Sequence, residues 1–218
     1  MKRYDVPRLV FVNKLDRMGA DPWNAIDQIR DRLGLCAAAV QVNIGVENGL
    51  EGVVDLVTMK AIYFDGDSGE TLRMEEIPDS MKQMCLEKKL ELIGTLAEID
   101  DKMEEYYMDE NHDVPIEELK ASIRKHTISL AFCPVFLGSA FKNKGVQPLL
   151  NGVIDYLPNP TEVRNFAFDP KGTEEDDKIE MEINNKKPFV GLAFKLEETQ
   201  YGQLTWIRVY QGKVKKGS

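Results

Sequence analysis

Two short apolar runs that lie far apart in the chain both end abruptly in small or polar residues. Residues 8–12 (RLVFV) continue into 13–16 (NKLD), and residues 134–137 (PVFL) continue into 138–140 (GSA). A continuous apolar run of this length is typical of a strand buried on both faces, which is the pattern of a parallel sheet. The chain must therefore fold around a sheet whose strands end in polar groups.

A helix-forming segment follows each apolar run. In the first, Asp21 is a suitable N-cap, Pro22 takes the first helical position, and Gly34 is a natural stop. The second ends at Pro158, and its apolar residues form one continuous face of the kind that normally packs on a core: Val146, Leu149, Leu150, Val153, Ile154 and Leu157. Strand, short loop and helix in this order predict an α/β fold.

The chain between the two runs has a different character. Short β-type runs bounded by Gly, Asn and Asp give way to segments rich in helix formers, in the order 39–44, 53–57, 61–64, 79–109 and 115–131. We therefore predict an α+β insertion over about residues 40–130, acidic, rich in helix and with a small core of its own.

The C-terminal part of the chain changes again. Residues 159–187 are acidic, polar and short of apolar residues, which predicts a linker or a long surface loop. Over residues 188–218 the period becomes two, and Val, Ile, Phe, Trp and Tyr are frequent, as in antiparallel strands. Two or three strands cannot close a barrel, so we expect a truncated second domain after a first domain over residues 1–158.

Composition excludes several functional classes. The formal net charge of −9 argues against non-specific binding to nucleic acid, DNA included, and no run approaches the roughly eighteen apolar residues of a membrane helix. The three cysteines form no CxxC pair, and His112 and His126 are isolated, so we predict no metal site and surface or structural histidines. Residues 65–76 partly imitate a calcium loop, but Glu70 occupies the position that requires glycine, and we predict a hairpin turn.

The two polar strand ends form the candidate site. In an open α/β sheet, ligands bind outside the carboxyl ends of the strands, so residues 13–16 and 139–140 can share one pocket. A fixed Asp16 carboxylate can accept both N–H donors of the guanine Watson–Crick edge, the ring N1–H and the exocyclic amine, a donor pair that adenine lacks. Lys14 can lay its methylene stem across the base, and Asn13 can brace the loop.

The second strand end would complete the pocket. An N–H near Ala140, next to Ser139, would donate to the guanine carbonyl oxygen. A wrong base would leave a buried carboxylate unpaired, at a cost of about 1–3 kcal/mol. The alternative interpretation is that Asn13 and Asp16 only cap a strand end for reasons of turn geometry, which is common.

Two longer segments resemble a known family. VPRLVFVNKLDRMGADP (6–22) and PVFLGSAFKNKGVQPLLNGVIDYLPNP (134–160) closely resemble elongation factor G, a family of translational GTPases, and in detail its mitochondrial form. Residues 188–218 resemble the start of the β-barrel domain that follows the GTPase domain in translation factors. The resemblance implies a P-loop-type GTPase sheet, in which residues 40–130 correspond to the insertion that this family carries.

The resemblance also implies a function and its residues. Asn13, Lys14 and Asp16 would be the guanine-specificity motif, and Ser139 and Ala140 the supporting loop. The ligand would be GTP or GDP, with Mg²⁺ in the intact protein. The intact protein would hydrolyse GTP to drive tRNA and messenger RNA through the ribosome, contacting ribosomal RNA and stalk proteins. Its location would be the mitochondrial matrix, although no targeting sequence is recognisable in this chain, and no membrane or DNA partner is implied.

The sequence departs from that family in what it lacks. It contains no G-x-x-x-x-G-K-[ST] loop to hold phosphates and place the magnesium ligand, and no switch segment. We therefore expect a fragment that holds half of a nucleotide pocket, has no catalytic residue of its own and does not hydrolyse GTP alone. The alternatives are a related release or recycling GTPase, and a truncated binding module whose acidic insertion holds a ribosomal or stalk protein without chemistry.

Overall fold

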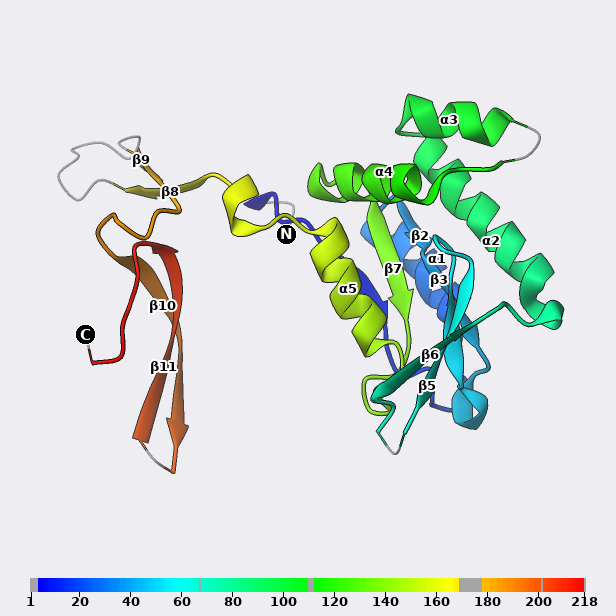
Figure 1. Ribbon diagram of the computed structural model, residues 1–218, viewed down its shortest axis with the longest axis horizontal. Helices are drawn as coiled ribbons and strands as arrows, with labels where there is room; N and C mark the ends of the chain where they lie inside the picture. The colour runs from blue at the N-terminus through cyan, green and yellow to red at the C-terminus, as the bar shows by residue number, and fades with distance from the viewer. Residues whose placement is uncertain (1–3, 67, 110–111, 169–177, 201, 218) are drawn as a thin grey trace. The chain divides into compact units, whose positions relative to one another are not determined.

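The computed structural model describes residues 4–66, 68–109, 112–168, 178–200 and 202–217 (Figure 1). The chain divides into two compact units, Met1–Leu157 and Pro158–Ser218. All the α-helices among the described residues lie in the first unit, whereas the second unit is built from strands and one 3₁₀ turn.

A three-stranded parallel sheet lies at the centre of the first unit, in the order β1-β7-β2. Strands β1 (Val10–Val12) and β7 (Cys133–Leu137) are the two predicted apolar runs, and they pair directly. Strand β2 (Ala37–Ala39) pairs with the other side of β7. Because all three strands run in the same direction, their carboxyl ends meet at one edge of the sheet, as the sequence predicted.

Helices cover both faces of this sheet. Helix α1 (Pro22–Leu33) packs on one face and begins as predicted, since the Asp21 carboxylate accepts the N–H groups of Trp23 and Asn24 at 3.0 and 3.1 Å. It ends at Gly34, whose φ of 58° is in the left-handed region. The opposite face is covered by α2 (Asp79–Ala97), α4 (Ile116–Ile128) and α5 (Val146–Tyr156).

Helix α5 presents a different face to the sheet from the one predicted. Three members of the expected core face are exposed: Leu150, Val153 and Ile154. The buried residues are instead Pro148, Gly152 and Tyr156. The cause lies at Gly152, because a Cβ added there would lie 2.2 Å from Cζ of the buried Phe136. The helix approaches β7 through its smallest residue, so the prediction from apolar spacing was wrong for those three side chains.

The predicted insertion contains a four-stranded antiparallel sheet in the order β3-β4-β5-β6. Its elements are β3 (Gln41–Ile44), the 3₁₀ turn η2 (Glu47–Gly49), β4 (Gly52–Asp55), β5 (Lys60–Asp65) and β6 (Thr71–Glu75). The helix-forming segment 79–109 divides into α2 and α3 (Asp101–Met108), because α2 ends at Ala97 and Asp100 caps a new helix by accepting the N–H of Lys102.

The core of the insertion is mostly shared with the parallel sheet. Its buried residues Val42, Leu92 and Leu119 belong to one cluster with Ala38 and Phe136 of that sheet. A separate small cluster contains only Val53, Ile62 and Phe64. The two sheets share a core because β2 continues through a single residue into β3. The prediction that the insertion has a core of its own is therefore correct only for the small cluster.

The predicted hairpin at residues 65–76 is confirmed. Strands β5 and β6 pair from Asp65 with Thr71 back to Ala61 with Glu75. The carboxylates that imitated calcium ligands form ion pairs instead, Asp65 with Arg73 and Glu76 with Lys60. Asp67, another member of the imitated loop, lies outside the described residues. In the described ranges, no group of three or more His, Cys, Asp or Glu residues is arranged to hold a metal ion.

The two histidines have structural surroundings. His126 is 7% exposed, and its Nε2 lies 2.9 Å from Oδ2 of Asp100, which also accepts the hydroxyl of Ser122 at 2.9 Å. His112 packs beside the Tyr107 ring with centroids 5.9 Å apart. The three cysteines are free thiols, two of them fully buried. Among the helices that the structure describes, none has the length and apolarity to cross a membrane.

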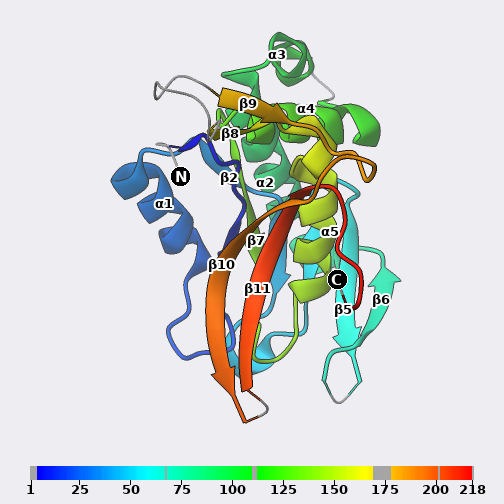
Figure 2. The same ribbon diagram turned by 90° about the vertical axis from the view of Figure 1, so that its left-hand side faces the viewer.

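The described residues of the second unit form two antiparallel pairs of strands. Figure 2 shows β10 (Val190–Thr199) and β11 (Gly202–Gln211) as two long neighbouring strands. They pair in antiparallel fashion, as predicted for residues 188–218. The segment 159–187 was expected to be a linker or a surface loop, yet it contains η3 (Pro160–Glu162), β8 (Asn165–Phe168) and β9 (Lys178–Met181). Residues 169–177 of that segment lie outside the described residues. Each of these strands has only four residues in a strongly acidic context, so the alternating pattern was too short to predict them.

Candidate functional site

The two polar strand ends meet at the carboxyl edge of the parallel sheet. The Ser139 hydroxyl, which follows β7, donates to Oδ1 of Asp16, which follows β1, over 2.6 Å. Ser139 is completely buried, and the Asp16 side chain is only 9% exposed. The backbone joins the same two loops, because the N–H of Leu15 donates to Gly138 O and that of Gly138 to Val12 O, both at 3.1 Å. The structure thus brings together residues that lie 123 positions apart.

Hydrogen bonding keeps Asp16 ionised. The Ser139 hydroxyl, helped by the nearby cations Arg17 and Lys142, holds the pKa of Asp16 below its ordinary value. Oδ2 of Asp16 faces Arg17 Nε at 3.8 Å, too far for a hydrogen bond. The site therefore presents a fixed anion that has unused acceptor capacity, as recognition of a paired N–H edge requires.

Asn13 and Ala140 are also brought together, through a hydrogen bond whose donor the sequence did not predict. The side-chain Oδ1 of Asn13 accepts the N–H of Lys14 at 2.7 Å and the N–H of Ala140 at 2.9 Å. Asn13 therefore braces both loops. The Ala140 N–H, expected to face a base carbonyl, is used within the protein here, so its role toward a base stays a prediction.

Lys14 has an unusual backbone conformation just after the end of β1. It is exposed and has a φ of 67°, in the left-handed region that non-glycine residues seldom adopt. The next residue, Leu15, is 1% exposed and anchors the loop in the core below helix α1. A buried Leu15 and a left-handed Lys14 together direct the loop outward, with the Lys14 stem available to cover a flat ligand.

Sequence reasoning missed several residues that support this site. The buried Gln41 accepts the N–H of Leu137 through Oε1 at 3.1 Å, one residue before the second loop. Glu47, in the turn η2, binds the first loop on both sides of Asp16. A glutamine inside the apolar run 37–44 (AAAVQVNI) is a signal that could have drawn attention to Gln41. An acid in a turn, such as Glu47, gives no periodic signal.

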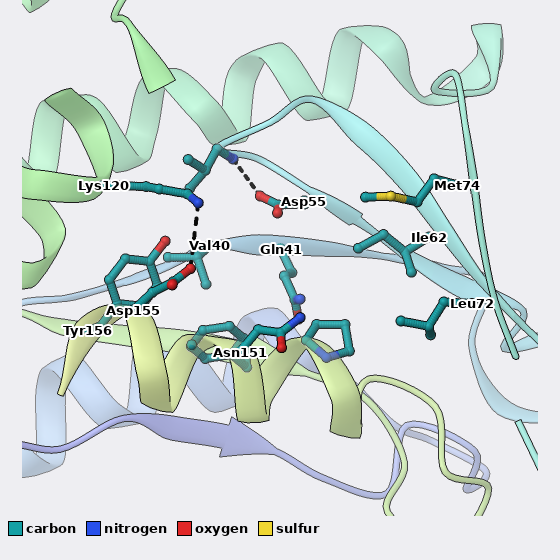
Figure 3. Close-up of a pocket in the computed structure, with 14 residues that line it drawn as sticks. Val40, Gln41, Asp55, Ile62, Leu72, Met74, Lys120, Asn151, Asp155 and Tyr156 are labelled. Carbon is teal, nitrogen blue, oxygen red and sulfur yellow. Dashed lines mark hydrogen bonds and ion pairs between the residues drawn. The ribbon is translucent and has the colours of Figure 1, made fainter. Parts of the chain in front are cut away.

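A separate cavity of about 240 Å³ lies between the insertion sheet and α5 (Figure 3). Gln41, Asp55 and Tyr156 line it together with apolar side chains of β5 and β6. Two further lining residues form an ion pair, with Lys120 Nζ 3.6 Å from Oδ2 of Asp155. Burial raises the pKa of Asp55, although the N–H groups of residues 57 and 58 donate to its carboxylate and oppose that rise. The five predicted residues are not among those that line this cavity, so it is distinct from the candidate site.

Comparison with known proteins identifies the family to which this chain belongs. The model of the elongation factor Tu GTP binding domain matches residues 1–159. The crystal structure of a protein from Thermus thermophilus is similar over 100% of this chain, with 25% sequence identity and a TM-score of 0.71. This chain spans 29% of the length of that protein. Since the family model matches well over half of the 218 residues, the chain belongs to the elongation factor Tu GTP-binding domain family of translational GTPases.

Proposed function

We propose that this chain forms the guanine-recognition side of the nucleotide site in a translational GTPase of the elongation factor G type. The observation that carries the proposal is the 2.6 Å hydrogen bond between Ser139 and Asp16, which unites two strand ends at the ligand-binding edge of the sheet. A second hydrogen bond, from the Ala140 N–H to Asn13, joins the same two loops. Membership of the family supports a guanine nucleotide as the ligand.

The proposed recognition rests on complementary hydrogen bonding. The Asp16 carboxylate accepts the guanine N1–H and 2-amino groups, and Lys14 covers one face of the base with its stem. Adenine has no N–H donor at its ring N1 and no 2-amino group, so it would leave the carboxylate unpaired. Ser139 keeps this carboxylate fixed and ionised. We assign no residue of this chain to the phosphates or to Mg²⁺, because the sequence contains no G-x-x-x-x-G-K-[ST] segment.

For the whole protein, we propose that GTP binding and hydrolysis drive the movement of tRNA and messenger RNA through the ribosome. This proposal rests on the resemblance of residues 6–22, 134–160 and 188–218 to elongation factor G. Ribosomal RNA and stalk proteins would be its partners. The same resemblance, in detail to the mitochondrial form, supports a location in the mitochondrial matrix.

A comparison of three nucleotides tests the base-recognition proposal. We expect the 218-residue chain to bind GDP more tightly than IDP, which lacks the 2-amino group, by roughly tenfold, and to bind ADP more weakly still. The three ligands share their diphosphate, so the affinity ratios report the base alone. Ligand-observed NMR competition measures the dissociation constants even where binding is weak. Equal affinities for all three would instead support the turn interpretation of Asn13 and Asp16.

A further inference from the structure

Two turns of the insertion reach back to the base-binding edge of the parallel sheet. The first is residues 45–50, which include η2 and lie between β3 and β4, and the second is residues 68–69, which lie between β5 and β6. We call residues 13–19 the first base loop and residues 138–145 the second base loop. The contacts between these turns and loops involve residues that the proposed guanine chemistry does not use.

Glu47 holds the first base loop at two points. Its backbone N–H donates to Leu15 O at 2.7 Å, and its side-chain Oε1 accepts the N–H of Gly19 at 2.8 Å. The two bonded positions flank Asp16. Glu47 does this with a φ of 56°, a left-handed conformation that costs a non-glycine residue on the order of 1 kcal/mol. An unfavourable backbone conformation at a residue with a two-sided contact indicates that the contact is specified by the surrounding structure.

The second base loop is held by both turns. Lys144 donates through Nζ to Leu50 O of the first turn at 2.6 Å. Asn143 donates through Nδ2 to Ser68 O of the second turn at 2.9 Å, and Gln147, in α5 just after the loop, donates to Gly69 O at the same distance. Asn143 also has a positive φ, 51°. The second turn packs closely here, because a Cβ added to Gly69 would lie 3.0 Å from the carbonyl oxygens of residues 142 and 143.

We propose that the insertion sets the guanine affinity of this domain, with Glu47 as the positioning residue of the first base loop and Asn143 as that of the second. The inference rests on the proposed guanine site. Recognition by Asp16 needs its carboxylate within about 0.5 Å and 10–20° of the plane of the base edge, and only supporting contacts provide such precision. The link also runs in the other direction, since guanine binding that moves these turns changes the affinity of the insertion sheet for a partner by the same factor.

Three variants of one turn test Glu47. Glu47→Ala removes the acceptor for Gly19, Glu47→Gln keeps an oxygen acceptor without the charge, and Glu51→Ala removes an exposed acid just beyond the same turn. We expect Glu47→Ala to weaken GDP binding about fivefold and to reduce the GDP-over-IDP preference, because a misplaced Asp16 no longer reads the 2-amino group. Glu47→Gln and Glu51→Ala should stay within about twofold of the parent chain.

A pair of substitutions at the second loop gives an independent test. Asn143→Gly removes the side chain while allowing the left-handed backbone, and it should lower GDP affinity with little change in melting temperature. Asn143→Ala should lower both the GDP affinity and the melting temperature, since alanine tolerates the left-handed backbone less well than asparagine does. A general loss of fold would change the melting temperature and the affinities for all nucleotides together, whereas a positioning role changes the GDP-to-IDP ratio.

The outcomes separate this inference from the proposed function. If Glu47→Ala binds GDP and IDP as Glu51→Ala does, or if Glu47→Gln is as weak as Glu47→Ala, the positioning role is wrong while the guanine site stands. If the parent chain itself does not distinguish GDP from IDP, the proposed function fails first. A fivefold loss of GDP affinity in Glu47→Ala, together with nearly parental GDP affinity in Glu47→Gln, supports the inference.

Discussion

Asp16→Asn is expected to change the base preference of this chain from guanine to xanthine. Xanthine carries a carbonyl where guanine carries its 2-amino group. An asparagine offers one acceptor for the ring N1–H and one donor for that carbonyl, whereas against guanine its amide would face another donor. We expect GDP affinity to fall roughly 10- to 100-fold and the affinity for xanthosine diphosphate to rise by a similar factor.

The Asp16→Asn substitution should change base recognition without disturbing the loop. Oδ1 of Asp16 accepts the Ser139 hydroxyl at 2.6 Å, and the side-chain oxygen of an asparagine can accept it equally. The loop should therefore keep its position while its hydrogen-bonding character changes. Asp31→Asn, the same change at an exposed position of α1, is the matched control and should leave both affinities unchanged. An Asp16→Asn chain with the parent's ratio of GDP to xanthosine diphosphate affinity would show that Asp16 does not read the base.

Gly152→Ala is expected to destabilise the first unit. The added Cβ would lie 2.2 Å from Cζ of Phe136 and 2.9 Å from two further atoms of that buried ring. Alanine favours helix over glycine by up to about 1 kcal/mol, but overpacking of a dense core costs about 1–3 kcal/mol. Because α5 approaches β7 at this glycine, we expect the clash to prevail, with a net loss of about 1–2 kcal/mol and a melting temperature about 2–8 °C lower.

The chain offers two controls for this prediction. Gly49→Ala should be nearly neutral, since a Cβ there meets nothing within 4 Å and its φ is not in the left-handed region. Combining Gly152→Ala with Phe136→Leu should recover part of the loss, because the smaller side chain makes room for the methyl group. Circular dichroism of the helices follows the first unit specifically, as the described α-helices all belong to it. A Gly152→Ala chain that melts above the parent would mean that the close approach of α5 to Phe136 is wrong.

The sequence was most informative where polar residues interrupted apolar ones. The ends of β1 and β7 were predicted from that interruption alone, and the structure brings Asp16 and Ser139 into contact at the sheet edge. Local capping rules were equally reliable at Asp21 and Gly34. These features depend on chemistry within a few residues, which a sequence displays directly.

Features that depend on distant contacts could not be predicted in the same way. The rotation of α5 follows from Gly152 meeting the ring of Phe136, a contact between two elements that periodicity does not reveal. The hydrogen bond from the Ala140 N–H to Asn13 Oδ1 was not predicted, because it depends on the distance between two loops. Glu47 was missed because its importance comes from a turn that returns to the sheet edge, and only the tertiary structure shows that return.

The most direct measurement of the central claim is a map of backbone amide chemical shifts as the chain is titrated with GDP. Recognition of guanine at the sheet edge predicts the largest changes in residues 13–16 and 138–145, smaller changes at Glu47 and Gly19, and saturation at the dissociation constant found by competition. The same titration with ADP should leave these amides in place. Changes centred on the cavity lined by Gln41 and Tyr156, or identical changes with GDP and ADP, would contradict the assignment of the guanine site.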